Sequence, residues 1–276
     1  MSVSNFIPKL WSARLLDHLD NAHIVANLVN RNYEGEITGC GDTVNICQLG
    51  AITVKDYTNS TDIEEPEELS TVQKVLNIDQ QKYFNFQIDD VDKAQAKGDL
   101  MDSAMQRSAY ALADETEKAI LKAMDTEGQK VVPSATLDET NVYKEILGLK
   151  VKMDKANVST NGRYLIVSPD VHGMLLLDSR FTGTGGANAE NNLSNGFVGR
   201  VLGFDVYLSN NLTSLTNGNG AIAGVQEAVT FAEQVVQTEA YRMEKRFADA
   251  VKGLNVFGVK VVIPEAVFLL KTTVTP

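Results

Sequence analysis

Side chains suited to metal binding or acid-base chemistry are few in this 276-residue chain, and their spacing does not assemble a site. The three histidines are His18, His23 and His172. His18 and His23 are five positions apart, whereas two histidines that share a metal on one helix are four apart. A site that used all three would require the N-terminal segment to fold onto a distant part of the chain. We therefore predict no metal site.

Nucleophiles are equally sparse. The two cysteines, Cys40 and Cys47, have no histidine nearby in sequence that would activate a thiolate. Their spacing fits neither a disulfide framework nor a zinc site, so we expect both to be small buried residues. The chain also lacks the GxSxG motif of a nucleophile elbow.

A glycine- and asparagine-rich loop at 181–199 contains the sequence GTGG from Gly183 to Gly186. A Walker motif needs a lysine after its last glycine, and no lysine occurs between Lys155 and Lys245. A dinucleotide-binding loop needs a strand before it and a helix after it, whereas Asn/Gly-rich sequence flanks both sides here. We therefore predict no catalytic residue, no cofactor and no enzyme activity. The alternative is a ligand-binding enzyme that uses 181–199 as a lid.

Three carboxylates, Asp89, Asp90 and Asp92, follow directly after a predicted strand. Such a cluster is able to hold a divalent cation, but no EF-hand pattern and no glycine at the turn position follow it. We favour roles at the end of the strand and the entry to the next helix.

The composition is that of an ordinary globular protein, with 43% hydrophobic and 22% charged residues, and the length suits one large domain or two modest ones. No apolar run approaches the ~20 residues of a membrane-spanning helix, and 1–14 lacks the layout of a signal peptide. We expect the protein to be made and kept in a cytoplasm.

The net charge of −11 is unevenly distributed along the chain. Residues 1–127 contain 11 Lys and Arg against 22 Asp and Glu, whereas 128–276 contain 14 against 14. Because an acidic protein gains no affinity from the release of phosphate counterions, we do not expect sequence-specific DNA binding. If the protein meets DNA, we expect it to enclose the DNA and not to bind it tightly.

The first 82 residues are expected to form an arm and a hairpin. Apolar residues recur every three to four positions through 1–32, as in an amphipathic helix. In this arm, Trp11 beside Arg14 suits a contact on another surface as well as it suits a core. The acidic segment 59–70 is expected to be a solvated hairpin tip, a charged surface that docks on a neighbouring chain, or both. The strands of this region are expected at 43–49, 51–57 and 72–78.

The rest of the chain is expected to mix helices with strands. Alternation with period two predicts a strand at 83–88, and 99–127 is predicted to be a helix of roughly 43 Å. Helices are then expected at 137–155 and 169–177, with strands at 163–167, 203–208, 221–225 and 228–231, an extended stretch at 234–241 and a strand that Pro264 ends.

Four segments of the sequence resemble the major capsid proteins of tailed bacteriophages with the HK97-type fold. The likeness covers both ends and the middle of the chain, and no catalytic motif lies inside it. The segments are FIPKLWSARLLDHLDNAHIVANLVNRNYEGEITGCGDTVNI (Phe6 to Ile46), YFNFQIDDVDKAQA (Tyr83 to Ala96), NGFVGRVLGFDVYLSNNL (Asn195 to Leu212) and AYRMEKRFADAVKGLNVFGVKVVIPEAV (Ala240 to Val267).

The resemblance implies an α+β fold with four parts. These are an N-terminal arm (1–42), an extended E-loop (43–82), a peripheral domain with the long spine helix (83–130 and 235–276) and a mixed α/β axial domain (131–234). It also implies a function: hexamers and pentamers of the chain would close into an icosahedral head around double-stranded DNA. Such a protein is found in the virion, is assembled in the host cytoplasm, and has portal and decoration proteins as partners. Because the arm-like sequence starts within the first ten residues, scaffolding, where needed, is expected from a separate protein.

An acidic E-loop cannot lie on an equally acidic neighbour without repulsion. We therefore expect acidic side chains of the loop to meet cationic side chains of an adjacent subunit, with the arm contributing as well. The predicted interface residues are Trp11, Arg14, Glu64, Glu65, Glu67, Glu68, Arg242, Lys245 and Arg246. Lys55, Lys74 and Lys82 lie in the E-loop region, but no covalent crosslink is predicted.

Two other structural roles remain alternatives. An encapsulin-like compartment uses the same fold to enclose cargo enzymes. The sequence argues against this alternative only in that its likeness is to the phage members of the fold. A tail tube subunit is usually dominated by β structure, so the predicted helix at 99–127 argues against it. The Gly/Asn-rich loop is expected near a symmetry axis, where flexibility lets one sequence serve rings of five and six.

Overall fold

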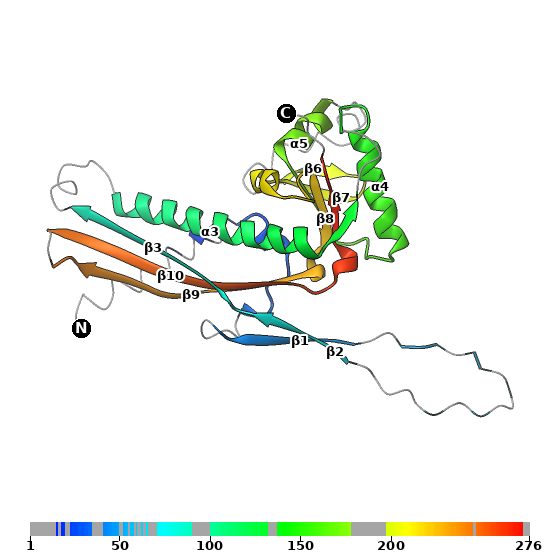
Figure 1. Cartoon of the computed structure of the whole chain (residues 1–276), viewed down its shortest axis with the longest axis horizontal. Helices are drawn as coiled ribbons and strands as arrows, with labels where there is room; N and C mark the ends of the chain where they lie inside the picture. Colours follow the sequence, from blue (N-terminus) through cyan, green and yellow to red (C-terminus); the bar gives the residue numbers. More distant parts are fainter. Residues whose placement is uncertain are drawn as a thin grey trace.

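A long helix lies along a narrow sheet, with a compact unit at one end and a projecting hairpin below it (Figure 1). This arrangement comes from a computed structural model. The residues that the structure describes are 15, 18–19, 23–34, 41–49, 52–54, 56–57, 59, 62, 65, 71–89, 100–131, 137–177, 197–244 and 247–272.

The projecting hairpin pairs β1 (Thr43–Leu49) with β2 (Thr71–Asn77) in antiparallel register. Its base is anchored by Val44, Ile46 and Leu76, which pack in a small apolar cluster with strands of the long sheet. The expected strand at 51–57 is wrong for the residues described there, since 52–54 and 56–57 belong to no strand. The ladder ends at the Leu49–Thr71 pair, so these residues have no partner strand within the described chain.

The narrow sheet has three antiparallel strands in the order β3 (Gln80–Asp89), β10 (Ala248–Val261) and β9 (Val229–Arg242). Side chains of β3 alternate, as predicted: Phe84 and Phe86 pack under the long helix, and Tyr83 is exposed. The two segments expected at 228–231 and 234–241 are one continuous strand, because β10 pairs along its whole length. Asp89 ends β3, whereas Asp90 and Asp92 lie outside the described residues.

The long helix, α3 (Leu100–Glu127), confirms the predicted spine and spans ~42 Å. Its two halves face different cores. Met105, Ala109 and Leu112 pack with the long sheet, whereas Ile120, Leu121 and Met124 belong to the main core of the compact unit. One rigid helix therefore connects the two parts of the molecule.

The compact unit is built on a six-stranded mixed sheet in the order β4-β11-β8-β5-β7-β6. Every residue of β5 is buried, which agrees with the apolar run that predicted this strand. β5 lies parallel to β7 and antiparallel to β8, so the sheet is neither purely parallel nor purely antiparallel. The strands are β4 (Gln129–Val131), β5 (Arg163–Val167), β6 (Phe197–Val201), β7 (Phe204–Leu208), β8 (Ala221–Val225) and β11 (Phe268–Leu270).

The strand expected at 203–208 begins one residue later, because Leu202 and Gly203 form the turn from β6 to β7, both with positive φ. β6 also takes up the last residues of the loop expected at 181–199, and the rest of that loop lies outside the described residues.

Helix α4 (Val142–Lys155) begins later than the predicted position 137. The Asp138 carboxylate accepts hydrogen bonds from the backbone N–H groups of Thr140 and Asn141, so the chain turns before the helix starts. Helix α5 (Pro169–Leu177) confirms its predicted range. Short 3-10 helices complete the unit: η2 (Ala26–Leu28), η5 (Asn210–Ser214), η6 (Gln226–Ala228) and η7 (Pro264–Ala266).

The C-terminal segment returns to the compact unit after the long sheet. After β10 the chain passes through η7, and β11 then pairs with β4 and β8. The expected division placed 235–276 entirely with 83–130. By strand pairing, β11 instead lies in the six-stranded sheet, and β9 already begins in the long sheet at Val229.

Candidate functional site

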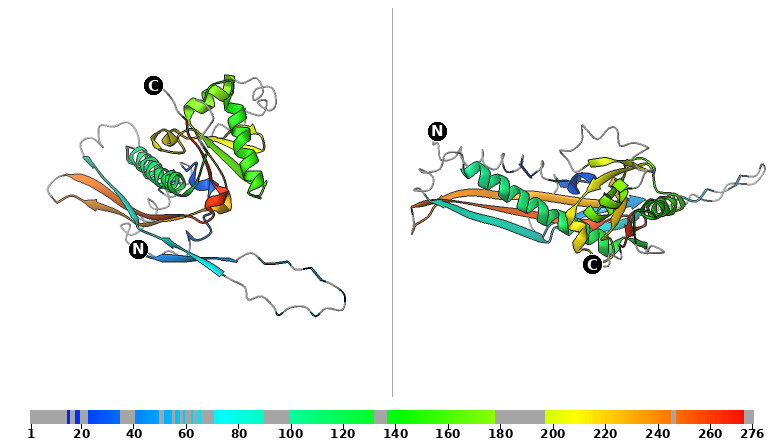
Figure 2. Two further views of the ribbon diagram at one scale, coloured as in Figure 1. Left: turned by 45° about the vertical axis from the view of Figure 1, so that its right-hand side comes forward. Right: turned by 90° about the horizontal axis from the view of Figure 1, so that it is seen from above.

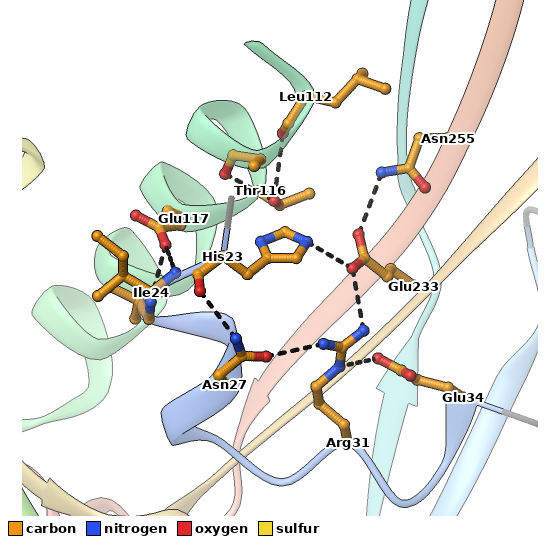
Figure 3. Close-up of polar contacts among 12 residues, drawn as sticks. His23, Ile24, Asn27, Arg31, Glu34, Leu112, Thr116, Glu117, Glu233 and Asn255 are labelled. Atoms are coloured by element: carbon orange, nitrogen blue, oxygen red, sulfur yellow. Dashed lines mark hydrogen bonds and ion pairs between the residues drawn. The ribbon is translucent and has the colours of Figure 1, made fainter. Parts of the chain in front are cut away.

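A group of hydrogen-bonded polar side chains joins the N-terminal arm to the spine helix and the long sheet (Figure 3). We call it the arm junction, and it comprises His23, Asn27, Arg31, Glu34, Glu117, Glu233 and Asn255. His23 Nε2 lies 2.8 Å from Glu233 Oε1, with both side chains buried. Since a carboxylate oxygen only accepts, the Nε2–H of His23 donates.

Glu233 is held from three directions. Besides His23, Arg31 Nη2 donates to its Oε1 at 3.4 Å, and Asn255 Nδ2 donates to its Oε2 at 3.3 Å. A buried carboxylate without such partners would be strongly destabilising. Arg31 is fixed in turn by Glu34, whose Oε1 lies 2.5 Å from Arg31 Nε.

Glu117 reaches the arm from the spine helix. Its Oε1 accepts hydrogen bonds from the backbone N–H groups of Ile24 at 2.5 Å and Val25 at 2.8 Å, so the side chain fastens the backbone just before η2. Burial raises the pKa of this carboxyl group above its ordinary value, and the two N–H donors only partly offset that effect.

The arm backbone also joins the long sheet. The N–H of Asn30 donates to the carbonyl of Val229 at 2.9 Å, and the N–H of Phe231 donates to the carbonyl of Asn30 at 2.9 Å. The described arm residues thus contact α3 through Glu117 and β9 through Glu233 and these backbone bonds. The arm junction is a structural anchor that holds the arm on the spine helix and the long sheet.

A second polar connection, which we call the Asp125 brace, links the end of the spine helix to the compact unit. Asp125 Oδ1 accepts the backbone N–H groups of Asn217 at 2.8 Å and Gly218 at 2.6 Å. Nearer the middle of the helix, Asn211 Nδ2 donates to Asp114 Oδ1 at 2.8 Å. Both contacts resist rotation of the compact unit about α3.

Sequence reasoning missed both connections. His23 was considered only as a metal ligand, whereas it pairs with a carboxylate 210 positions away. The available signals were polar residues inside apolar patterns, such as Glu117 within the helical stripe and Glu233 between two expected strands. Those signals indicate buried partners but do not identify them.

Among the described residues, no three His, Cys, Asp or Glu side chains are placed to share a metal ion, and no helix is long and apolar enough to cross a bilayer.

Of the predicted interface residues, the structure describes Glu65 and Arg242. Glu65 is exposed on the projecting hairpin, and Arg242 Nη1 lies 3.0 Å from Asp249 Oδ1 on the neighbouring strand. Figure 1 shows the hairpin and the end of β9 at opposite ends of the molecule, so one chain does not bring them together. The other predicted residues lie outside the described part: Trp11, Arg14, Glu64, Glu67, Glu68, Lys245 and Arg246.

The hairpin exposes apolar side chains as well as acidic ones. Ile52, Val54 and Tyr57 are 69%, 93% and 69% exposed. Three such side chains on one projecting segment are unusual for a surface that stays in water.

A spine helix on a long narrow sheet, a compact mixed unit and a projecting hairpin together define the HK97-type capsid fold. The comparisons agree. The sequence pattern of a family described as phage capsid protein matches residues 73–271, so the chain belongs to that family. It is a capsid structural protein of the tailed-phage major capsid type, which associates with copies of itself in the virion.

Solved structures extend the comparison. The chain is 30% identical to a structure from Mycobacterium phage Che8, with 90% of this chain and 91% of that chain covered and a TM-score of 0.71. The capsid of cyanophage P-SCSP1u is 16% identical over 92% of this chain and 87% of that one, with a TM-score of 0.67. A virus-like particle from Pyrococcus furiosus shares the fold at 13% identity, covering 96% and 99%, with a TM-score of 0.61. No curated protein matches the sequence.

Proposed function

We propose that the chain assembles as hexamers and pentamers into an icosahedral phage head that encloses double-stranded DNA and has no enzymatic role. The observation that carries this proposal is the projecting hairpin, whose exposed apolar residues Ile52, Val54 and Tyr57 need a cover that a second copy supplies. The net charge of −11 suits a capsid shell that encloses DNA without binding it tightly. Assembly takes place in the host bacterial cytoplasm.

In this proposal the parts of the chain have distinct roles. Residues 1–42 are the arm, 43–82 the E-loop, 83–130 with the long C-terminal strands the peripheral domain, and the six-stranded unit the axial domain. The pairing of β11 supports including 268–270 in the axial domain. Scaffolding, where it is needed, comes from a separate protein, and portal and decoration proteins complete the head.

The contact between neighbours pairs the acidic loop with a basic end of the long sheet. Glu64, Glu65, Glu67 and Glu68 of one subunit meet Arg242, Lys245 and Arg246 of the next, and Trp11 and Arg14 add a contact from the arm. Arg242 lies at the exposed end of the long sheet, with 48% of its side chain accessible while it pairs with Asp249. Exposed ion pairs contribute little singly, so this contact selects the neighbour and the register more than it supplies affinity.

The test is assembly of the purified protein, followed by size-exclusion chromatography and negative-stain electron microscopy, with and without its scaffolding partner. Wild type should form shells, or rings of five and six. The double variant Ile52→Asn, Val54→Asn should fold normally, because both positions lie outside the ladder, and should fail to assemble. Asn45→Gln, at an exposed position of β1, is the matched control. A wild-type chain that stays monomeric under both conditions would refute the proposal.

An encapsulin-like compartment is the alternative, and the particle from Pyrococcus furiosus shares only the fold. The phage family match and the 30% identity to the Che8 structure favour the phage head. Particles purified from infected cells should contain DNA; protein cargo in its place would favour the compartment.

A further inference from the structure

Exposed apolar side chains in the described part of the chain gather in a few places. Outside the hairpin and the long sheet, the largest group lies on the two helices of the compact unit, where Leu147, Val151, Leu176 and Leu177 are 40%, 41%, 50% and 70% exposed. The two helices, α4 and α5, contact each other. We call these four exposed side chains together the helical patch.

The helical repeat explains why these residues point outward. The buried face of α4 carries Val142, Ile146, Leu149 and Met153, which pack in the main core. Leu147 and Val151 are four positions apart and lie on the opposite face. That face of a surface helix is ordinarily polar, so two aliphatic side chains there are unexplained by the fold of one chain.

Each helix also carries a glycine on its outward face. A Cβ built at Gly148 or Gly173 meets nothing within 4 Å, so no close contact inside the chain requires glycine at either position. Glycine in the middle of a helix is unfavourable relative to alanine. A surface from outside that approaches these helices closely would explain both residues.

The charge on α4 indicates the chemistry of that outside surface. The helix contains four lysines against Glu145 and Asp154, so it is locally basic in a chain of net charge −11. Lys150 pairs with Asp154 at 2.7 Å. Within the described part of the chain, Lys144, Lys152 and Lys155 form no ion pair, and all three are exposed. Acidic groups of another molecule would complement them.

We propose that the helical patch is a second self-association surface, occupied by the next copy of this chain. The inference rests on the proposed assembly and adds a contact to it. A second copy fits because the protein self-associates, because its surface is on balance acidic, and because α4 lies at the same side of the molecule as the hairpin in all three views (Figures 1 and 2). The proposal assigns both surfaces to one neighbour and makes the contact heterologous, as ring closure requires.

Gly148 provides the sharpest test. Gly148→Ala and Gly148→Gln remove the unfavourable glycine and meet no atom of their own chain, so the unassembled variants should unfold at a higher temperature than wild type. The same substitutions place atoms where the neighbour approaches. We expect Gly148→Gln to raise the protein concentration at half-assembly by about tenfold or more, and Gly148→Ala to have a smaller effect in the same direction. Light scattering and size-exclusion chromatography measure both.

Thr126→Gln is the control, because it adds the same side chain at an exposed position of α3. It should assemble as wild type does. Gly148→Gln with wild-type assembly, or equal losses in Gly148→Gln and Thr126→Gln, would overturn the helical patch as a contact surface. Those outcomes differ from failure of the proposed function, in which wild type itself forms no rings or shells.

Discussion

The Asp125 brace predicts that one carboxylate makes a large contribution to the stability of the unassembled chain. Asp125 is 8% exposed and accepts two short backbone hydrogen bonds, from Asn217 and from the buried N–H of Gly218. Two weaker bonds to its Oδ2, from the N–H of Thr216 at 3.4 Å and Nδ2 of Asn217 at 3.3 Å, complete the set. Asp125→Ala removes every acceptor and leaves the Gly218 N–H buried and unpaired.

The magnitude follows from the two short bonds. Hydrogen bonds to a charged group contribute ~1.5–3 kcal/mol each, and partial water access at Asn217 reduces its share, so we expect Asp125→Ala to lower the free energy of unfolding by about 3–5 kcal/mol. Asp125→Asn keeps one oxygen for the two N–H groups but turns an NH2 group towards the N–H of Thr216. We expect that variant to lose about 1–2 kcal/mol.

Urea denaturation of the unassembled chain, followed by far-UV circular dichroism, measures both variants. Hydrogen exchange at the Gly218 amide gives a local readout, since its protection should fall in Asp125→Ala before that of the β5 amides. An Asp125→Ala protein within 0.5 kcal/mol of wild type would show that the carboxylate does not hold the loop, and the reasoning would fail. The same would follow if Asp125→Asn were the more damaging of the two.

Three further predictions concern single side chains. A Cβ at Gly253 would overlap the ring of Phe84, a side chain, whereas a Cβ at Gly258 would overlap the backbone carbonyl of Asn77. Gly253→Ala should therefore destabilise by ~1–3 kcal/mol and less than Gly258→Ala, and urea denaturation ranks them. Arg163 is buried and donates to the backbone carbonyls of Ser159 at 2.7 Å and Val158 at 2.6 Å, so Arg163→Ala should lose about 3 kcal/mol by the same assay, and a loss below 1 kcal/mol would contradict this. Burial raises the pKa of Glu117 above 4.5, so its ionised form opposes folding at neutral pH, and this contribution fades as pH falls through the raised value. Glu117→Gln should therefore be more favourable relative to wild type at pH 7 than at pH 5, and a pH-independent difference would contradict the assignment.

The elements that the sequence predicted correctly are those whose own pattern determines their environment. The spine helix at 100–127 carries a continuous apolar stripe, and the strand at 163–167 is apolar throughout and buried throughout. The errors arose where the structure of a segment depends on a partner that is distant in the sequence. Polar residues near Glu233 broke the apolar pattern and suggested two strands, whereas pairing with β10 makes one strand and buries Glu233 against His23.

The same distinction applies to the site. Exposed acidic residues such as Glu65 are recognisable in the sequence, because a cluster of acidic side chains indicates a surface position without knowledge of the fold. The arm junction is not, since its members come from four separate segments, and only the folded chain brings His23, Glu117 and Glu233 together (Figure 3). The projection of the hairpin away from the body is likewise a property of the tertiary structure.

The N-terminal arm packs against each of the three apolar clusters of this molecule. Leu15 and Leu19 pack with the first half of the spine helix and the long sheet, and Val25 and Val29 pack in the main core of the compact unit. Tyr33 packs against the cluster at the base of the hairpin. Because one continuous segment contributes to all three apolar clusters, and the arm junction fixes it between them, loss of these contacts would loosen the hairpin and the compact unit at once. If one neighbour engages both the hairpin and the helical patch, as proposed above, their relative position has to be held within one chain, and the arm is the element placed to hold it.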